Sequence, residues 1–196
     1  MKRPLPVCLA TLLWAGAALA QPSVPSTLSG VAAGGVSAPG ARPELNALPH
    51  VRLVGAARLT VWGFDIYDAR LWAPANFSAT SFATSALALE LNYLRSFQAA
   101  DIAERSLREM RRSQPVSDAQ AAQWKAHLLR VIPDVRKGDR ITGVHRPGQG
   151  AAFWVNGRAS GEIPDADFAR LFFGIWLSPD TSEPRMREAL LAGSGE

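Results

Sequence analysis

The sequence predicts one α+β domain over residues 51–192, and three observations lead to this fold class. Segments with the two-residue alternation of strands fall into two groups, and each group is followed by two segments with the 3.6-residue period of helices. The order is therefore three strands, two helices, three strands and two helices. Strands that cluster in this way favour α+β over a doubly wound parallel sheet, in which single strands and helices alternate.

The N-terminus has the organisation of a signal peptide. Lys2 and Arg3 precede an apolar run over residues 5–19, and Ala18-Leu19-Ala20 provides the small residues that signal peptidase requires. The run is shorter than the roughly 20 residues needed to cross a bilayer, which makes a retained membrane anchor the weaker alternative. We therefore expect residues 1–20 to be removed after Ala20, and the mature protein to be periplasmic or secreted.

Composition excludes several classes of site from the mature chain. Cys8 is the only cysteine and lies in the predicted signal peptide, so disulfides, thiolate metal sites and cysteine nucleophiles are all excluded after cleavage. Loss of Lys2 and Arg3 from the 21 basic residues leaves 19 against 17 acidic ones. The sequence contains no dense block of Lys and Arg residues, so no nucleic-acid partner is predicted. No further apolar segment is long enough to predict stable membrane insertion.

Residues 21–49 are rich in Pro, Gly, Ala and Ser. Such a segment has too few large apolar side chains to offset the entropy lost on ordering. We therefore predict a disordered leader that ends immediately before the domain.

The first group of strands begins at residue 51. Val51–Val54 is a short strand, and residues 58–72 form a strongly β-forming run with a bend or bulge at Gly63. Both faces of this run are largely apolar, which predicts a central strand covered on each side. Residues 85–93 alternate more regularly. One face of that strand carries Leu87, Leu89, Leu91 and Tyr93.

Two helices follow these strands. The first spans residues 101–112, and Pro115 ends it. Its predicted buried side chains are Ala103, Leu107 and Met110. Ser117 and Gln120 form a capping-box pattern that begins the second helix, which continues to Pro133.

The second group of strands spans residues 140–145, 151–155 and 159–163. Asn156-Gly157 predicts a tight hairpin between the last two, because both central residues of such a turn require positive φ.

Asp165 is the predicted N-cap of the helix that follows this group. The helix carries a wide apolar stripe, formed by Phe168, Leu171, Phe172, Ile175 and Trp176. Pro179 stops it, and a last helix begins near Ser182.

Most catalytic patterns are missing from the sequence. There is no Gly-x-Ser-x-Gly nucleophile elbow and no phosphate-binding glycine-rich loop between a strand and a helix. His50, His127 and His145 share no metal-ligand spacing, so we expect them to be surface or hydrogen-bonded histidines. No catalytic residue, metal or cofactor is predicted.

Arg70 is the residue most suggestive of a binding site. On a regular strand it shares a face with Trp62, Phe64, Asp68 and Trp72, and an arginine in such surroundings requires an anion. Asp68 could provide that anion in a structural ion pair. Alternatively, Arg70 and the hydroxyl of Tyr67 or Tyr93 could hold the carboxylate of a bound organic acid. The sequence leaves both interpretations open.

Several blocks together resemble the bacterial chalcone isomerase-like family, in the same order and over about residues 51–192. The blocks are residues 63–72, the strand 87–93, Ala103-Glu-Arg-Ser-Leu-Arg-Glu-Met110, Gly138-Asp-Arg-Ile-Thr-Gly143 and Phe172-Phe-Gly-Ile-Trp-Leu-Ser-Pro179. The resemblance implies the chalcone isomerase fold, in which an antiparallel sheet packs against a helical layer with a ligand cleft between them.

Plant chalcone isomerases close a flavanone ring in a cleft lined by an arginine, two threonines, a tyrosine and an asparagine. By resemblance, the threonine positions fall near Trp62 and Ile175, and the arginine could only be Arg52 or Arg70. The helix over residues 101–112 has no counterpart of the tyrosine or asparagine. The resemblance extends to non-catalytic relatives in which an arginine and a tyrosine hold a fatty-acid carboxylate.

The leading hypothesis is an exported, non-catalytic protein that binds a fatty acid or similar amphipathic acid in an apolar cleft. The expected ligand-binding residues are Arg70, Tyr67, Tyr93, Trp62 and Trp176. One alternative is an isomerase or intramolecular lyase acting on an enone, whose carbonyl oxygen would accept a hydrogen bond from Arg70 or a tyrosine. Another is an envelope protein that contacts a protein partner through the helix face with Arg105, Arg108 and Arg112.

Overall fold

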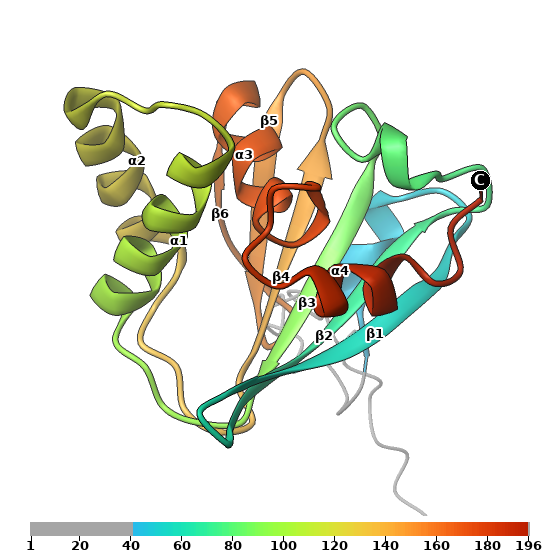
Figure 1. Ribbon diagram of the computed structural model, residues 1–196, viewed down its shortest axis with the longest axis horizontal. Coiled ribbons are helices and arrows are strands. Elements are labelled where there is room, and N and C mark those ends of the chain that lie inside the picture. The colour runs from blue at the N-terminus through green and yellow to red at the C-terminus, as the bar shows by residue number, and fades with distance from the viewer. Residues whose placement is uncertain (1–40, 196) are drawn as a thin grey trace, which may run out of the picture. The chain divides into compact units, whose positions relative to one another are not determined.

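The computed structural model describes residues 41–195, and its centre is one antiparallel sheet of six strands. The strands lie side by side in sequence order, so each pairs with the next along the chain (Figure 1). They are β1 (Val51–Val61), β2 (Phe64–Pro74), β3 (Leu87–Tyr93), β4 (Arg140–Arg146), β5 (Gly150–Val155) and β6 (Arg158–Ile163). This sheet and its helices confirm the predicted α+β class and the predicted order of elements.

One face of the sheet is covered by helices. Helix α3 packs on β4 and β5, α4 packs on β1 and β2, and α1 packs between α2 and α3 (Figure 1). The α-helices are α1 (Ala99–Ser113), α2 (Asp118–Val131), α3 (Ala166–Leu177) and α4 (Pro184–Leu191). Two short 3-10 helices are η1 (Pro43–Ala47) and η2 (Ala79–Ser81). None of the helices described here is both long enough and apolar enough to cross a membrane.

The continuous strand predicted over residues 58–72 is wrong. The chain reverses at Trp62-Gly63, and the segment forms the end of β1 and most of β2, paired as a hairpin. Both turn residues have positive φ, 50° at Trp62 and 79° at Gly63, as a two-residue hairpin turn requires. Because tryptophan is rarely found in this conformation, the sequence favoured a bend within one strand.

The main core lies between the sheet and the helices, and the predicted faces of the strands and helices supply it. The face of β3 with Leu87, Leu89, Leu91 and Tyr93 is buried here, as are Ala103, Leu107 and Met110 of α1. Gly55 lets β1 approach α4 closely, because a Cβ at this position would lie 2.3 Å from the carbonyl oxygen of Ala189.

The predicted starts of α2 and α3 are confirmed by their caps. Ser117 accepts a hydrogen bond from the backbone N–H of Gln120 at 3.2 Å, at the start of α2. Asp165 accepts one from the N–H of Phe168 at 2.9 Å, and its second oxygen accepts one from Trp124 Nε1 at 2.8 Å. Asp165 therefore both caps α3 and joins it to α2.

The structure changes the predicted boundary of the leader. Residues 41–48, which we call the strap, fall within the predicted leader, yet they include η1 and pack on the sheet face opposite the helices. Leu48 is buried there against Ala88 and Val144. The strap belongs to the domain because a few apolar and charged side chains anchor it, which bulk composition does not reveal. The predicted signal peptide and its cleavage site lie outside the described residues.

Candidate functional site

The structure places the five predicted ligand-binding residues in three different locations. Tyr67, Tyr93 and Trp176 lie on the helix-covered side of the sheet. Arg70 lies on the opposite face, because it is an odd number of residues from Tyr67 along β2. Trp62 is at the tip of the β1–β2 hairpin and is 93% exposed. The expectation that all five line one cleft is therefore wrong.

Tyr67 and Trp176 form a polar pair at the sheet–helix interface. The indole Nε1 of Trp176 donates a hydrogen bond of 2.9 Å to the Tyr67 hydroxyl. Trp176 is buried, whereas Tyr67 is half-buried. Within residues 41–195 the Tyr67 hydroxyl has no acceptor for its own proton. The pair thus holds a fixed hydroxyl with one unused donor.

The environment keeps the Tyr67 hydroxyl protonated. Burial raises its pKa to about 12, although the hydrogen bond from Trp176 acts in the opposite direction. The negative charges of Glu183 and Glu109 raise the pKa further, and Arg105 lowers it. A tyrosine in this state donates a hydrogen bond at neutral pH, and a carboxylate or carbonyl oxygen would accept it.

An aromatic row extends from Tyr67 along the same edge. Its ring meets that of Tyr93 edge to face, with centroids 5.9 Å apart, and Tyr93 meets Phe97 at the same distance. Burial, together with the neighbouring Tyr67, raises the pKa of Tyr93. Phe97, Ile102 and Ile175 are partly buried and pack against the same core cluster as Tyr67. This edge of the interface therefore combines one anchored hydroxyl with aromatic side chains.

Charged side chains of α1 lie close to this edge. Arg105 pairs with Glu109 at 2.9 Å, and Arg112 approaches the second oxygen of Glu109 at 3.6 Å. The Glu109 side chain is buried, and its Oε2 has no hydrogen-bond partner among the described residues. Arg105 is more than half exposed. The positive charge of Arg105 is also the one that acts on the pKa of the Tyr67 hydroxyl.

The deeper interface is filled by aromatic rings. Phe172 of α3 contacts Phe153, Phe168, Phe173 and Trp176, with centroid distances of 5.3–5.6 Å. Such packing fills the centre of the core with side chains.

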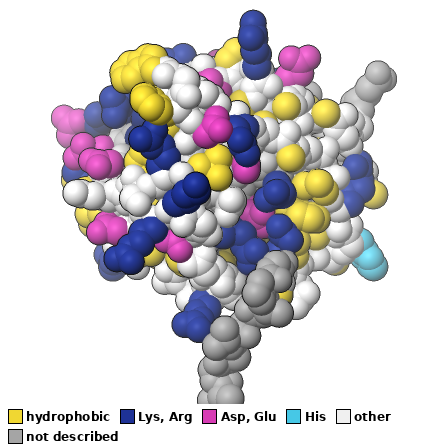
Figure 2. Space-filling view, turned by 90° about the horizontal axis from the view of Figure 1, so that it is seen from below, with side chains coloured by type: hydrophobic (Ala, Val, Ile, Leu, Met, Phe, Trp, Pro, Cys, Tyr) yellow, Lys and Arg dark blue, Asp and Glu magenta, His cyan; other side chains and the backbone are white. Residues whose placement is uncertain are grey.

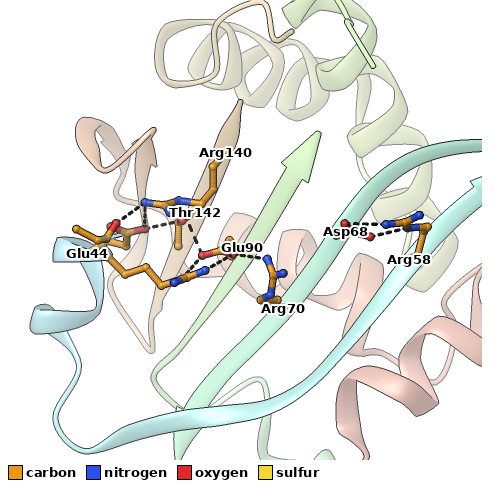
Figure 3. A network of polar contacts seen from close by, with 9 residues as sticks. Glu44, Arg58, Asp68, Arg70, Glu90, Arg140 and Thr142 are labelled. Carbon is orange, nitrogen blue, oxygen red and sulfur yellow. Dashed lines mark hydrogen bonds and ion pairs between the residues drawn. The ribbon is translucent and has the colours of Figure 1, made fainter. Parts of the chain in front are cut away.

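On the opposite face, Arg70 belongs to a network of charges (Figure 3). Its Nη1 donates to Glu90 Oε1 at 2.9 Å, and Arg42 of the strap donates to both oxygens of Glu90. The predicted partner Asp68 pairs with Arg58 of β1 instead, at 2.7 Å. The structural interpretation of Arg70 as one half of an ion pair is right, but the partner is different. Strand register explains this, since Arg70 lies directly opposite Glu90 and Arg58 opposite Asp68.

The Glu90 carboxylate is fully buried yet ionised. Burial favours the neutral acid, but hydrogen bonds from Arg42 and Arg70, with the charges of Arg42 and Arg140, outweigh it and lower the pKa of Glu90. A second buried carboxylate, Glu44 of the strap, accepts a hydrogen bond of 2.8 Å from Thr142 and lies 3.6 Å from Arg140. These contacts secure the strap to β3 and β4 (Figure 3).

His145 lies inside the domain, between β4 and the helix layer. His145 is buried, its Nδ1 lies 2.9 Å from the carbonyl oxygen of Ser85, and its ring packs against Phe173. This confirms His145 as a hydrogen-bonded histidine. Across residues 41–195, no three His, Asp or Glu side chains gather in a way that could hold a metal ion.

Comparisons with known proteins agree with this architecture. A family profile described as chalcone isomerase-like matches residues 45–192. The chain belongs to the chalcone isomerase-like family. Its fold is similar to the crystal structure of an Arabidopsis thaliana fatty-acid binding protein, with a TM-score of 0.57, 12% sequence identity, and coverage of 73% of this chain and 87% of that one. A search of curated proteins gives no significant match.

Sequence reasoning missed two groups of residues in this chalcone isomerase-like domain. The Glu90 network depends on Arg42 and Glu44, which composition assigned to the leader, and on a strand register that the sequence does not state. The proximity of Arg105 to Tyr67 depends on how α1 packs. The available signal was Glu90 itself, a carboxylate at the middle of an otherwise buried strand.

Proposed function

We propose that this protein is an exported, non-catalytic member of the chalcone isomerase-like family that binds a fatty acid or similar amphipathic carboxylic acid. The acid's carboxylate accepts a hydrogen bond from the Tyr67 hydroxyl, with Arg105 supplying positive charge. Its apolar part lies against Phe97, Ile102 and Ile175. Arg70 has no role in this proposal, because its guanidinium faces the other side of the sheet and pairs with Glu90.

The observation that carries the proposal is the Tyr67–Trp176 pair. Its hydroxyl is oriented by a buried indole, remains protonated and has an unused proton beside apolar side chains. A hydrogen bond from a neutral donor to a charged acceptor is stronger than one between neutral groups. The similarity in fold to a fatty-acid binding protein supports the same ligand class.

The first test identifies what the protein carries and where it is found. The full chain is expressed in a bacterium, recovered from the periplasmic fraction without detergent, and measured by native mass spectrometry and solvent extraction. We expect an intact mass that lacks residues 1–20 and a reproducible extra mass that extracts as a carboxylic acid. A protein that retains these residues in the cytoplasmic fraction would contradict export, and an empty protein that also fails to bind oleate would contradict acid binding.

The second test asks whether Tyr67 is the anchor. Tyr67→Phe should weaken oleate binding about tenfold or more, because a hydrogen bond to a charged group contributes about 1.5–3 kcal/mol. Tyr93→Phe is the matched control, since it removes the same hydroxyl from the neighbouring ring, which lacks the bond to Trp176. Equal effects of the two substitutions would contradict the assignment.

The same Tyr67 hydroxyl favours a second candidate, the enone isomerase, because a protonated donor also stabilises a developing oxyanion. Cyclisation of naringenin chalcone above the background rate, lost in Tyr67→Phe, would support it over a binding protein. We expect the purified protein to leave the background rate unchanged.

A further inference from the structure

The tip of the β1–β2 hairpin presents a tryptophan to solvent. Trp62 is 93% exposed, the highest value among the exposed large hydrophobic side chains of the described region. Phe64, which follows the turn, is 56% exposed. Both side chains lie at a single point of the fold, and neither contributes to the buried core clusters.

The backbone conformation makes this tryptophan unusual. Trp62 has φ of 50°, in the left-handed region that bulky side chains rarely adopt. The same turn conformation occurs between β5 and β6, where Asn156 has φ of 52° and Gly157 has φ of 78°. That hairpin uses the residues that suit the geometry best. An exposed tryptophan gains little from the fold in compensation for this strain, which points to a role outside it.

The hairpin projects beyond the rest of the sheet. Pairing between β2 and β3 ends at Tyr67 and Tyr93, and one further hydrogen bond joins Leu94 N–H to the carbonyl of Ile66 at 2.9 Å. The turn residue Gly63 is four residues before Tyr67 in the chain, and this separation corresponds to roughly 13 Å of extended strand. The tip can therefore reach a surface that the remainder of the domain does not enter.

Basic side chains lie at this end of the sheet, and one of them contacts the tip. The guanidinium of Arg95 lies over the Phe64 ring, 4.5 Å from its centroid. Arg136 and Lys137 lie in the loop before β4, which is bonded to the end of β3 through Tyr93 and Gly138. Arg95, Arg136 and Lys137 are exposed, and no carboxylate in residues 41–195 forms an ion pair with them. Figure 2, which views the protein from below, shows Lys and Arg side chains over this face, with hydrophobic and acidic groups among them.

We propose that the hairpin tip docks this protein peripherally onto an anionic phospholipid bilayer. Trp62 and Phe64 enter the headgroup interface, where amphipathic aromatic rings are most favourably placed. Arg95, Arg136 and Lys137 contact the lipid phosphates and hold the domain by charge. The surface area of two apolar side chains at a hairpin tip is far smaller than the roughly 1,000 Å² that a stable protein interface buries. This difference favours a lipid surface over a protein partner.

The test is flotation of the full-length protein with vesicles of POPC and POPG at a ratio of 7:3, compared with pure POPC. Wild type should float with the anionic vesicles, less with pure POPC, and less again as salt rises from 50 to 500 mM (about 14 to 4 Å in screening length). Trp62→Asn should reduce the vesicle partition constant about tenfold, because it removes a large interfacial side chain. It should also melt at the same or a higher temperature, since it recreates the Asn-Gly turn found at Asn156-Gly157.

The matched control is Leu129→Asn, which removes another exposed apolar side chain, 44% exposed and on α2, and should bind vesicles as wild type does. Wild type that does not float, or Trp62→Asn that floats equally well, would overturn the proposal. Wild type that ignores vesicles but forms a stable complex with a protein through Trp62 would overturn it too. This inference does not depend on acid binding, because Trp62→Asn should leave oleate affinity unchanged while Tyr67→Phe should leave flotation unchanged.

Discussion

The two faces of the sheet are buried by different means. Leu89 and Leu91 of β3 face the helices and pack into an aromatic core, whereas Glu90, between them, faces the strap. Both faces of β3 are buried from water, because Leu89 and Leu91 on one face and Glu90 on the other have little or no exposed surface. One face is stabilised by the removal of apolar area from water, and the other by three arginines around two carboxylates.

This difference determines how each face tolerates change. The helix-covered face depends on complementary shapes, and a missing side chain leaves a cavity. The strap-covered face depends on complete charge pairing, and a missing carboxylate leaves arginines without an anion. The second face anchors one chain segment, the strap, to β3 and β4.

The largest expected effect is on the helix-covered face. Phe172→Ala should lower the free energy of unfolding by about 3–5 kcal/mol, because it removes a ring that contacts four other aromatic side chains. Urea denaturation measures the change. Leu129→Ala on α2 is the control and should change stability by less than about 1 kcal/mol. Comparable losses in the two variants would mean that the aromatic cluster is not the main source of stability.

A smaller loss is expected on the strap-covered face. Glu90→Ala should cost about 3 kcal/mol, at the lower end for a broken buried ion pair, because Arg42 and Arg70 retain partial contact with water. Proteolysis should then cut near the strap before the helices. The control is Glu104→Ala, which removes an exposed carboxylate paired with Lys125 and should leave the urea midpoint unchanged. Unaltered stability in Glu90→Ala would show that the network does not secure this face.

The same contrast explains how far the sequence could predict this structure. The helix-covered face was predictable because burial leaves a periodic pattern, as in Leu87 to Tyr93, and because caps such as Asp165 act locally. Asn156-Gly157 was predictable for the same local reason. Trp62-Gly63 was not, since its residue type conflicts with its conformation.

The candidate site was less predictable than the fold. Tyr67, Tyr93 and Trp176 are close in space, but Arg70 differs from Tyr67 by an odd number of residues and must face away from it on a regular strand. The partner of Arg70 is set by strand register, and the partner of Glu44 is Thr142, which follows 98 residues later in the chain. Pairings over such separations have no local signature in one sequence.

Acidification should distinguish the two faces by the pH at which each loses stability. Burial lowers the pKa of His145 below its ordinary value of 6.5, although hydrogen bonds to the carbonyls of Ser85 and Phe82 oppose this. The pKa of Glu90 lies below its ordinary value of 4.5. In both cases the unfolded chain binds the proton more readily than the folded one, so stability falls as pH drops below the ordinary value.

The decline below pH 6.5 therefore belongs to His145 on the helix-covered face, and a part of the decline below pH 4.5 belongs to Glu90 on the strap-covered face. Urea midpoints measured from pH 8 to pH 3 should show both. His145→Gln should flatten only the first region, and Glu90→Gln should flatten part of the second while lowering stability at neutral pH. If Glu90→Gln leaves the slope below pH 4.5 as steep as in wild type, its charge is not what holds the strap, and the packing of Leu48 against Ala88 and Val144 must do so instead.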